Sequence, residues 1–220
     1  MSYSFTNRTG GVSTGAFASL NFGLHVGDDP SQVLTNRKIL TERVGPVQFM
    51  SQEHGNKIAL IQGVIDSDPV ADSLVTGIPG INLAVQVADC IPLLLSSDVA
   101  VAAVHVGRKG LVNGVALRTL ELMKEMGANS ISATIGPAIC GECYEVSEEI
   151  FTEVVQLHPT AAAKRIDGTF ALDLPRALMA ALESQGVPVT REGNCTVKDS
   201  QLFSYRRDGV TGRQVGVISL

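Results

Sequence analysis

The chain has 220 residues and a formal net charge of −5, with 45% hydrophobic and 18% charged residues. A chain of this length and composition can bury a substantial apolar core, which argues against intrinsic disorder. Its negative charge provides no long-range attraction to nucleic acid or to anionic lipid, so we expect neither as a partner.

The N-terminal segment shows no targeting or membrane-spanning pattern. It reads MSYSFTNRTGG, without a basic region followed by an apolar run. The longest apolar stretches, at 91–95 and 99–104, are far shorter than the ~20 residues of a membrane helix. The four cysteines are too few and too unevenly spaced for a disulfide framework. We therefore expect a cytoplasmic protein with free thiols.

The first thirty residues are rich in glycine, serine, threonine and asparagine, a composition that favours turns. We expect a long loop there. A helix is predicted next, because Asp28-Asp29 offers an acidic N-cap and Pro30 suits the first helical turn. The helical pattern continues until Gly45-Pro46 ends it.

Three short apolar runs follow between residues 81 and 106, namely INLAVQVA, IPLLLSS and VAAVHVG. Each is partly β-branched and is bounded by Asp, Pro or Ser, which is typical of strands buried on both faces. Helical periodicity then extends over 111–126 and stops at Gly127. The centre of the chain is therefore predicted to be a buried sheet followed by a helix.

The last part of the chain alternates between strands and helices. The segment ISATIGPAI is predicted to be a strand, and helices are predicted over 147–157 and 174–185. The final segments, CTVKD, LFSYRRDG and RQVGVISL, are predicted to be short strands and turns. No repeat or linker divides the chain. We therefore predict an α+β fold in which residues 1–220 form a single-domain sandwich of mixed β-sheets flanked by helices.

Three residues that can carry chemistry occupy similar positions in this pattern. His54 follows the apolar stretch VQFM and precedes a glycine, and His105 lies near the end of VAAVHVG. Cys90 lies between two apolar strands, next to Asp89, which needs a polar partner if it is buried. Because all three lie where strands are expected to end, we expect them to converge in one site.

Each of the three also has a purely structural interpretation. A single histidine is more often a hydrogen-bonded structural residue, and a single cysteine is more often a small buried hydrophobe. Together, two imidazoles and one thiolate make a three-ligand zinc set with an open fourth position. The intervals of 36 and 15 residues match none of the short linear zinc motifs.

Several segments, in this order, resemble the motifs of the family known as purine nucleoside phosphorylase, laccase domain or polyphenol oxidase. They cover nearly the whole chain and read TNRTGGVSTGAFASLNFGLHVGDDP, VLTNRKIL, QEHG, ADSLVTGIPGINLAVQVADCIPLLL, VAAVHVGRKG, IGPAICGECYEV and FSYRRDGVTGR. In that family the histidine of Q-x-H-G, the cysteine of A-D-C and the first histidine of H-x-G-W-R-G bind zinc. The resemblance thus implies zinc ligation by His54, Cys90 and His105.

The resemblance further implies phosphorolysis of adenosine and inosine, with nucleoside and phosphate as partners and adenosine deamination on the same site. It implies a mixed-sheet sandwich similar to cysteine-hydrolase toxin domains. Some relatives are instead linked to the editing of peptidoglycan precursors, and older naming describes copper-dependent polyphenol oxidation. Copper ranks below zinc here, because one Cys/His₂ set falls short of the several sites of a multicopper enzyme.

The chain departs from the family pattern beside the predicted metal site. Where relatives have Gly-Trp-Arg-Gly, it has Gly107-Arg108-Lys109-Gly110. A strand that leads into this turn and then a helix can form an anion cradle, so Arg108 and Lys109 are predicted to bind phosphate, with a solvated turn as the alternative. Asn21 and Arg37, which are polar residues of the family motifs, are predicted to help form the substrate pocket.

Three mechanisms remain open for the predicted site. In the first, zinc activates water or assists departure of the base, with Asp89 as a catalytic acid or a group that orients a ligand. In the second, Cys90 is a thiolate nucleophile activated by His105, and the protein is an amidase. In the third, zinc is structural and the protein is a binding module, which requires a fourth ligand such as Asp89.

A second sulfur motif, Cys140-Gly141-Glu142-Cys143, has the C-x-x-C spacing of dithiol redox sites and of half zinc sites. The chain contains no second C-x-x-C that would complete a four-cysteine site. We therefore expect neither redox nor metal chemistry from this motif.

Overall fold

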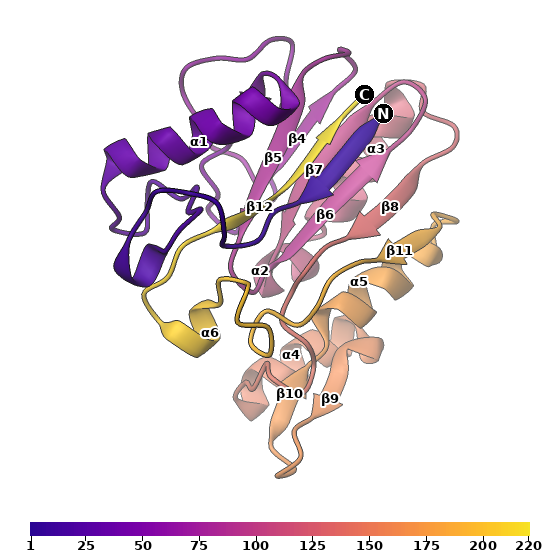
Figure 1. The fold of residues 1–220 in the computed structure, drawn as a ribbon. Coiled ribbons are helices and arrows are strands. Elements are labelled where there is room, and N and C mark those ends of the chain that lie inside the picture. Colours follow the sequence, from indigo (N-terminus) through magenta and orange to yellow (C-terminus); the bar gives the residue numbers. More distant parts are fainter.

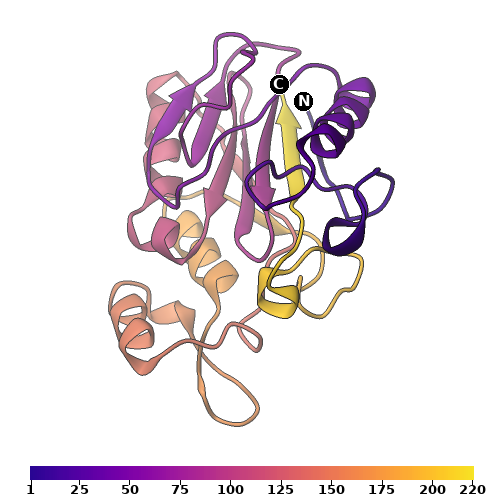
Figure 2. The same cartoon turned by 90° about the vertical axis from the view of Figure 1, so that its left-hand side faces the viewer.

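The computed structural model describes residues 1–220 and contains two large β-sheets that pack face to face, with helices outside them (Figure 1). The view in Figure 2 shows these layers from the side, with α1 beyond one sheet and α3 beyond the other. None of the helices combines the length and the apolar character that a membrane span requires.

The first sheet has four strands in the order β1-β12-β5-β2, of which only the β2–β5 pair is parallel. Its strands are β1 (Ser2–Phe5), β12 (Gln214–Ser219), β5 (Asn82–Val87) and β2 (Val47–Gln48). Strand β1 contradicts the prediction of an unbroken N-terminal loop. Its partner β12 lies at the other end of the chain, so the pairing leaves no local signal in the sequence.

The second sheet has six strands in the order β11-β8-β6-β7-β4-β3, and its centre is antiparallel. Its strands are β11 (Val189–Arg191), β8 (Ser132–Ile135), β6 (Ile91–Ser96), β7 (Val101–Val106), β4 (Ser73–Thr76) and β3 (Ile58–Leu60). A separate hairpin consists of β9 (Ala162–Lys164) and β10 (Phe170–Leu172). The three strands predicted between residues 81 and 106 are confirmed as β5, β6 and β7.

The predicted helices are observed with one correction, and a short helix, α6 (Tyr205–Asp208), lies in the segment LFSYRRDG, where strands and turns were predicted. Helix α1 (Pro30–Val44) begins at the predicted cap, where the side chain of Asp29 accepts a hydrogen bond from the N–H of Ser31. The helix predicted over 111–126 is two helices, because Gly114 adopts a left-handed conformation (φ 74°) that interrupts it. The helices and 3₁₀ turns are η1 (Gly15–Phe17), α1, α2 (Arg108–Val112), α3 (Val115–Glu125), α4 (Glu148–Leu157), η2 (Pro159–Ala161), α5 (Leu174–Glu183) and α6 (Tyr205–Asp208).

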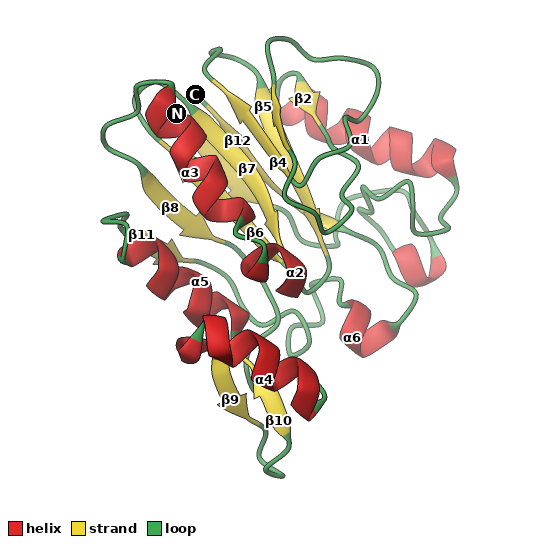
Figure 3. Ribbon diagram, turned by 180° about the vertical axis from the view of Figure 1, so that it is seen from behind, coloured by secondary structure: helices red, strands yellow, loops and turns green.

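Three apolar clusters hold the layers together. The largest lies between the six-stranded sheet and helices α2, α3 and α5, which cover its outer face in Figure 3. A second fills the space between the two sheets, and a third packs α1 and the N-terminal loop onto the four-stranded sheet. The predicted α+β sandwich of mixed sheets flanked by helices is therefore confirmed.

Candidate metal centre

Cys90 and the two histidines come from three separate segments. Cys90 lies in the short connection from β5 to β6, and His105 lies in β7, which pairs with β6. His54 lies in the loop between β2 and β3, with a left-handed backbone (φ 59°) where a strand end was expected. The sheet pairing therefore brings Cys90 close to His105, and the loop adds His54 from the side.

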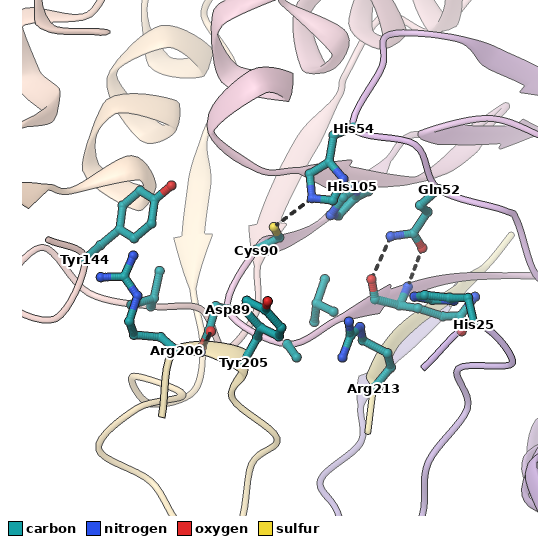
Figure 4. Close-up of a pocket in the computed structure, with 14 residues that line it drawn as sticks. His25, Gln52, His54, Asp89, Cys90, His105, Tyr144, Tyr205, Arg206 and Arg213 are labelled. Carbon is teal, nitrogen blue, oxygen red and sulfur yellow. Dashed lines mark hydrogen bonds between the residues drawn. The ribbon is translucent and has the colours of Figure 1, made fainter. Parts of the chain in front are cut away.

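The three side chains form a compact cluster, which we call the His/Cys cluster. The ligand atoms of His54, Cys90 and His105 all lie within 4.8 Å of one another. The Sγ of Cys90 is 3.7 Å from the Nε2 of His54, and the ring centroids of His54 and His105 are 4.6 Å apart (Figure 4). One thiolate and two imidazoles at these separations can bind a metal ion.

A buried carboxylate, Asp72, holds the two histidines in place. Its Oδ1 lies 2.8 Å from the Nδ1 of His105 and accepts a hydrogen bond of 3.0 Å from the backbone N–H of His54. Its Oδ2 accepts one of 2.6 Å from the N–H of Gly55, and its backbone carbonyl accepts from the N–H of His105. Because Asp72 engages Nδ1, the Nε2 of His105 is left to face Cys90.

Gly107 gives the cluster the room that it needs. A Cβ atom at this position would lie 2.9 Å from the Sγ of Cys90 and 3.1 Å from the Cδ2 of His54. Its φ of −87° is one that any residue adopts, so glycine is required here for space rather than for backbone freedom.

The charges of the cluster are mutually stabilising. Burial raises the pKa of the Cys90 thiol, but the charge and hydrogen bond of His105, together with His54, outweigh burial and lower this pKa to about 6. Burial lowers the pKa of His105, whereas the thiolate of Cys90 and the carboxylate of Asp72 raise it to about 9. In the metal-free protein Cys90 and His105 therefore form a thiolate–imidazolium pair near pH 7, and the thiolate is also the form that binds metal.

The cluster opens into a cavity of about 410 Å³. This is the size of a pocket for a small organic molecule. Figure 4 shows the His/Cys cluster on one side of the cavity, Tyr144 and Arg206 on another, and His25 and Arg213 on a third. The cavity therefore combines metal-binding groups with aromatic rings and with two cations.

The two cations are held by the protein backbone. Arg206 lies over the ring of Tyr144 at 5.0 Å, and its Nη1 donates to the carbonyl oxygen of Glu145. Arg213 donates through Nη1 to two carbonyl oxygens of its own turn. Burial lowers the pKa of His25, and the charge of Arg213 lowers it further, so both favour the neutral imidazole.

Asp89, a predicted catalytic residue, has a left-handed backbone (φ 94°) and lines the cavity, but its carboxylate is fully engaged. Its Oδ1 accepts hydrogen bonds from the hydroxyls of Thr196 (2.6 Å) and Ser204 (2.7 Å), and its Oδ2 accepts one from the N–H of Arg206 (2.6 Å). These three groups are the polar partners that a buried Asp89 was predicted to need. Asp89 therefore ties the C-terminal segment to the loop that carries Cys90.

Two of the predicted substrate-binding residues lie outside the lining of this cavity. Asn21 is buried and accepts hydrogen bonds from the N–H groups of Gly23 and Arg213, so it supports the turn that carries Arg213. Arg37 forms an ion pair with Asp68 at 2.9 Å and lies 4.0 Å from the ring of Phe49. It lines a neighbouring cavity that shares His25 and Gln86 with the first.

The other two, Arg108 and Lys109, begin the short helix α2. Arg108 lies 3.7 Å from the carboxylate of Glu153 in α4, and Lys109 is exposed. Neither lines the cavity of the His/Cys cluster. The structure thus brings His54, Cys90, His105 and Asp89 together, and it places all four predicted substrate residues outside the lining.

Sequence analysis did not identify the cavity-lining residues His25, Tyr144, Tyr205 and Arg213, and it also missed two residues that position the His/Cys cluster. One is Asp72, which stands in the segment ADS and has no feature that separates it from a turn residue. The other is Gln52, whose side chain pairs with both backbone groups of Gln86 (2.7 and 2.8 Å) and so docks the His54 loop onto β5. Both lie in segments that resembled family motifs, QEHG and ADSLVTG, and that resemblance was the only available signal.

Known proteins resemble this chain over its whole length. A protein of Corynebacterium glutamicum named purine nucleoside phosphorylase is 43% identical over 98% of this chain and 93% of its own length. One of Streptomyces coelicolor with the same name is 42% identical over 99% and 95%. The crystal structure of a Neisseria meningitidis protein of the DUF152 family has a TM-score of 0.91 at 37% identity and covers 99% of this chain and 93% of that one.

The family described as multi-copper polyphenol oxidoreductase laccase matches residues 2–220. The match includes the three segments of the His/Cys cluster and all the residues that line its cavity. The suspected resemblance is thereby confirmed, and the chain belongs to this laccase-like family.

Proposed function

We propose that the protein is a zinc-dependent purine nucleoside phosphorylase that binds its metal through His54, Cys90 and His105. The observation that carries this proposal is the single cavity in which a metal-binding cluster faces aromatic and cationic side chains. The names of the Corynebacterium and Streptomyces relatives support the same activity.

The donor set fits zinc. Ligand distances of about 2.0 Å for nitrogen and about 2.3 Å for sulfur put neighbouring N and S atoms about 3.5 Å apart around a tetrahedral ion. The 3.7 Å between Cys90 Sγ and His54 Nε2 agrees with this value. A bound zinc ion would supply Lewis-acid polarisation at its open fourth position. A single site of this kind does not favour the multicopper chemistry of the family description.

The cavity walls offer the remaining groups that phosphorolysis needs. In this reaction a phosphate oxygen bonds to C1′ of the ribose while the bond from C1′ to the base breaks, and the base leaves with the electron pair. We assign phosphate to Arg206 and Arg213, which line the cavity, in preference to Arg108 and Lys109, which do not. Tyr144 and Tyr205 provide faces on which a purine ring can stack. Asp89 serves to position the C-terminal wall.

The activity is tested with metal-loaded protein and inosine or adenosine, by measuring free base and ribose 1-phosphate with and without phosphate. We expect base release that requires phosphate, stops on chelation and returns with zinc. Arg213→Gln raises KM for phosphate by roughly 10-fold or more, since a hydrogen bond to a charged group contributes about 1.5–3 kcal/mol. Arg118→Gln, an exposed arginine of α3, is the matched control. Absence of phosphate-dependent base release contradicts the proposal. Measuring the inosine formed from adenosine tests for deamination separately.

A second candidate function rests on the line formed by Asp72, His105 and Cys90. A thiol beside an imidazole that a carboxylate orients is the arrangement of cysteine hydrolases, so these residues also suit an amidase, with peptidoglycan precursors as the substrate class. Turnover that persists in excess chelator and is lost when Cys90 is alkylated selects this alternative over the zinc enzyme.

A further inference from the structure

A second sulfur cluster lies outside the cavity of the His/Cys cluster. The Sγ atoms of Cys140, Cys143 and Cys195 all lie within 4.8 Å of one another. Together with Cys90 they account for all four cysteines of the chain, and all four are free thiols that are only partly exposed. Cys195 thus supplies the third sulfur that the C-x-x-C motif lacks in the linear sequence. We call this group the three-cysteine cluster.

Backbone hydrogen bonds build the cluster from two turns. The N–H groups of Cys143 and Tyr144 both donate to the carbonyl oxygen of Cys140, which closes the C-x-x-C turn and brings its two sulfurs together. The N–H groups of Lys198 and Asp199 both donate to the carbonyl oxygen of Cys195, which forms a second tight turn. The two turns are joined by a parallel bridge between Ala138 and Cys195.

Two groups beside the sulfurs can stabilise negative charge on them. The N–H of Cys140 donates to the Sγ of Cys195 at 3.3 Å, and hydrogen bonds of this kind stabilise negative charge on sulfur. Lys198 adds a positive charge close to Cys140 and Cys143, while it forms an ion pair with Glu142. Cys140 and Cys195 line an open cavity of about 470 Å³, so an ion can reach the cluster.

Three thiolates at this separation repel one another unless a cation lies between them. A tetrahedral zinc ion with ligand distances of about 2.3 Å places its sulfurs about 3.8 Å apart, which falls inside the observed limit. Water can supply the fourth donor, and Asp173 lies in the same cavity, beside Gly141. We propose that Cys140, Cys143 and Cys195 form a second zinc site, separate from the His/Cys cluster.

This site joins two walls of the cavity of the His/Cys cluster. The segment with Cys140 and Cys143 also carries Ile139 and Tyr144, and the segment after Cys195 carries Arg206. Zinc at this site therefore fixes the position of Tyr144 relative to Arg206. The hydrogen bond from Arg206 to the carbonyl oxygen of Glu145 is a second link between the same two segments. The role of this zinc ion is to stabilise the cavity walls. The proposal therefore does not depend on which substrate the cavity binds.

The test uses full-length Cys90→Ser protein, in which the only thiols left are those of the three-cysteine cluster. It is reconstituted with cobalt(II) under reducing, anaerobic conditions, and near-ultraviolet sulfur-to-cobalt absorption is recorded. We expect strong absorption that zinc abolishes by displacing cobalt. Adding Cys195→Ser lowers its intensity by roughly a third, in line with the loss of one of three thiolates, and weakens binding. Because Cys90 is absent, the result does not depend on the function of the His/Cys cluster.

Absence of sulfur-to-cobalt absorption in folded Cys90→Ser protein overturns the proposal. So does a disulfide between any two of these cysteines in wild-type protein whose thiols are blocked at lysis, since that result makes the group a redox pair. Elemental analysis of the proteins as purified gives an independent measure. The Cys90→Ser protein is expected to keep roughly one zinc ion per chain and the Cys90→Ser/Cys195→Ser protein to lose it.

Discussion

The two sulfur clusters of this protein differ in the side chains that surround their cysteines. Cys90 faces His105 and His54, and their protons stabilise its thiolate. Cys143 faces two other thiols. Burial raises its pKa, and Cys140 and Cys195 raise it further, to about 12. The comparison shows that imidazole neighbours lower the pKa of a thiol. Thiol neighbours raise the pKa of Cys143, whereas that of Cys195, which accepts the N–H of Cys140, is lowered.

The largest expected difference between the clusters is in thiol reactivity in metal-free protein. Near pH 7 we expect iodoacetamide to modify Cys90 roughly 100-fold faster than Cys143, because the pKa of Cys90 is lowered and that of Cys143 is raised; the greater intrinsic nucleophilicity of a high-pKa thiolate offsets only part of this difference. The rate at Cys90 rises through pH 6 and levels off above it, because deprotonation is then complete. Iodoacetamide labelling followed by peptide mass spectrometry measures both rates.

The control for this comparison is His105→Gln, which removes the positive charge beside Cys90. It moves the midpoint of Cys90 labelling from near pH 6 toward the ordinary thiol value of about 8.5. A labelling rate at Cys90 that still climbs steeply between pH 7 and 9 in the wild-type protein would show that the two clusters do not differ in this way.

An intermediate effect is expected from Asp72→Asn, which changes only the His/Cys cluster. Asp72 fixes the ring of His105 and the backbone of His54, and loss of such a partner typically weakens metal binding 10–100-fold. Zinc affinity measured by competition with a chromogenic chelator checks this expectation. Asp98→Asn, at an exposed carboxylate, is the matched control. An Asp72→Asn protein with unchanged zinc affinity would remove Asp72 from the metal centre.

The smallest effect is expected from Gly107→Ala. The added methyl group crowds Cys90 and His54 without altering any ligand, so we expect zinc affinity at the His/Cys cluster to fall roughly 10-fold, or about 1.4 kcal/mol. Gly63→Ala provides the control, because a Cβ there meets no atom within 4 Å. In a Cys90→Ser background the cobalt spectrum of the three-cysteine cluster should not change with Gly107→Ala. If it does, the substitution has disturbed the fold rather than the metal centre.

The long, periodic elements were predictable from sequence, and the short ones were not. Strands β5, β6 and β7 and helix α1 carry their own apolar patterns and caps, so each was identified locally. The strands β1, β3 and β4 have three or four residues and exist only through partners elsewhere in the chain. The break at Gly114 was missed because apolar periodicity continues across it.

The His/Cys cluster was predicted for a different reason. The residues alone indicated only that His54, Cys90 and His105 all lie near predicted strand ends, and the ordered family motifs implied that they bind a metal ion together. The role of Asp72 depends on three-dimensional contacts that no spacing reveals. Cys195 lies 52 residues beyond Cys143, so its arrival beside the C-x-x-C motif likewise depends on the fold, through the bridge to Ala138.

The hydrogen bonds of Asp89 have a consequence for synthesis on the ribosome. Its partners Ser204 and Arg206 lie 115 and 117 residues later in the chain, and strand β12, which follows them, inserts between β1 and β5. A nascent chain therefore holds His54, Cys90 and His105 long before it has the C-terminal wall of their cavity. Until β12 emerges, β1 and β5 lack their shared neighbour, and a chain that terminates early exposes these strand edges to aggregation.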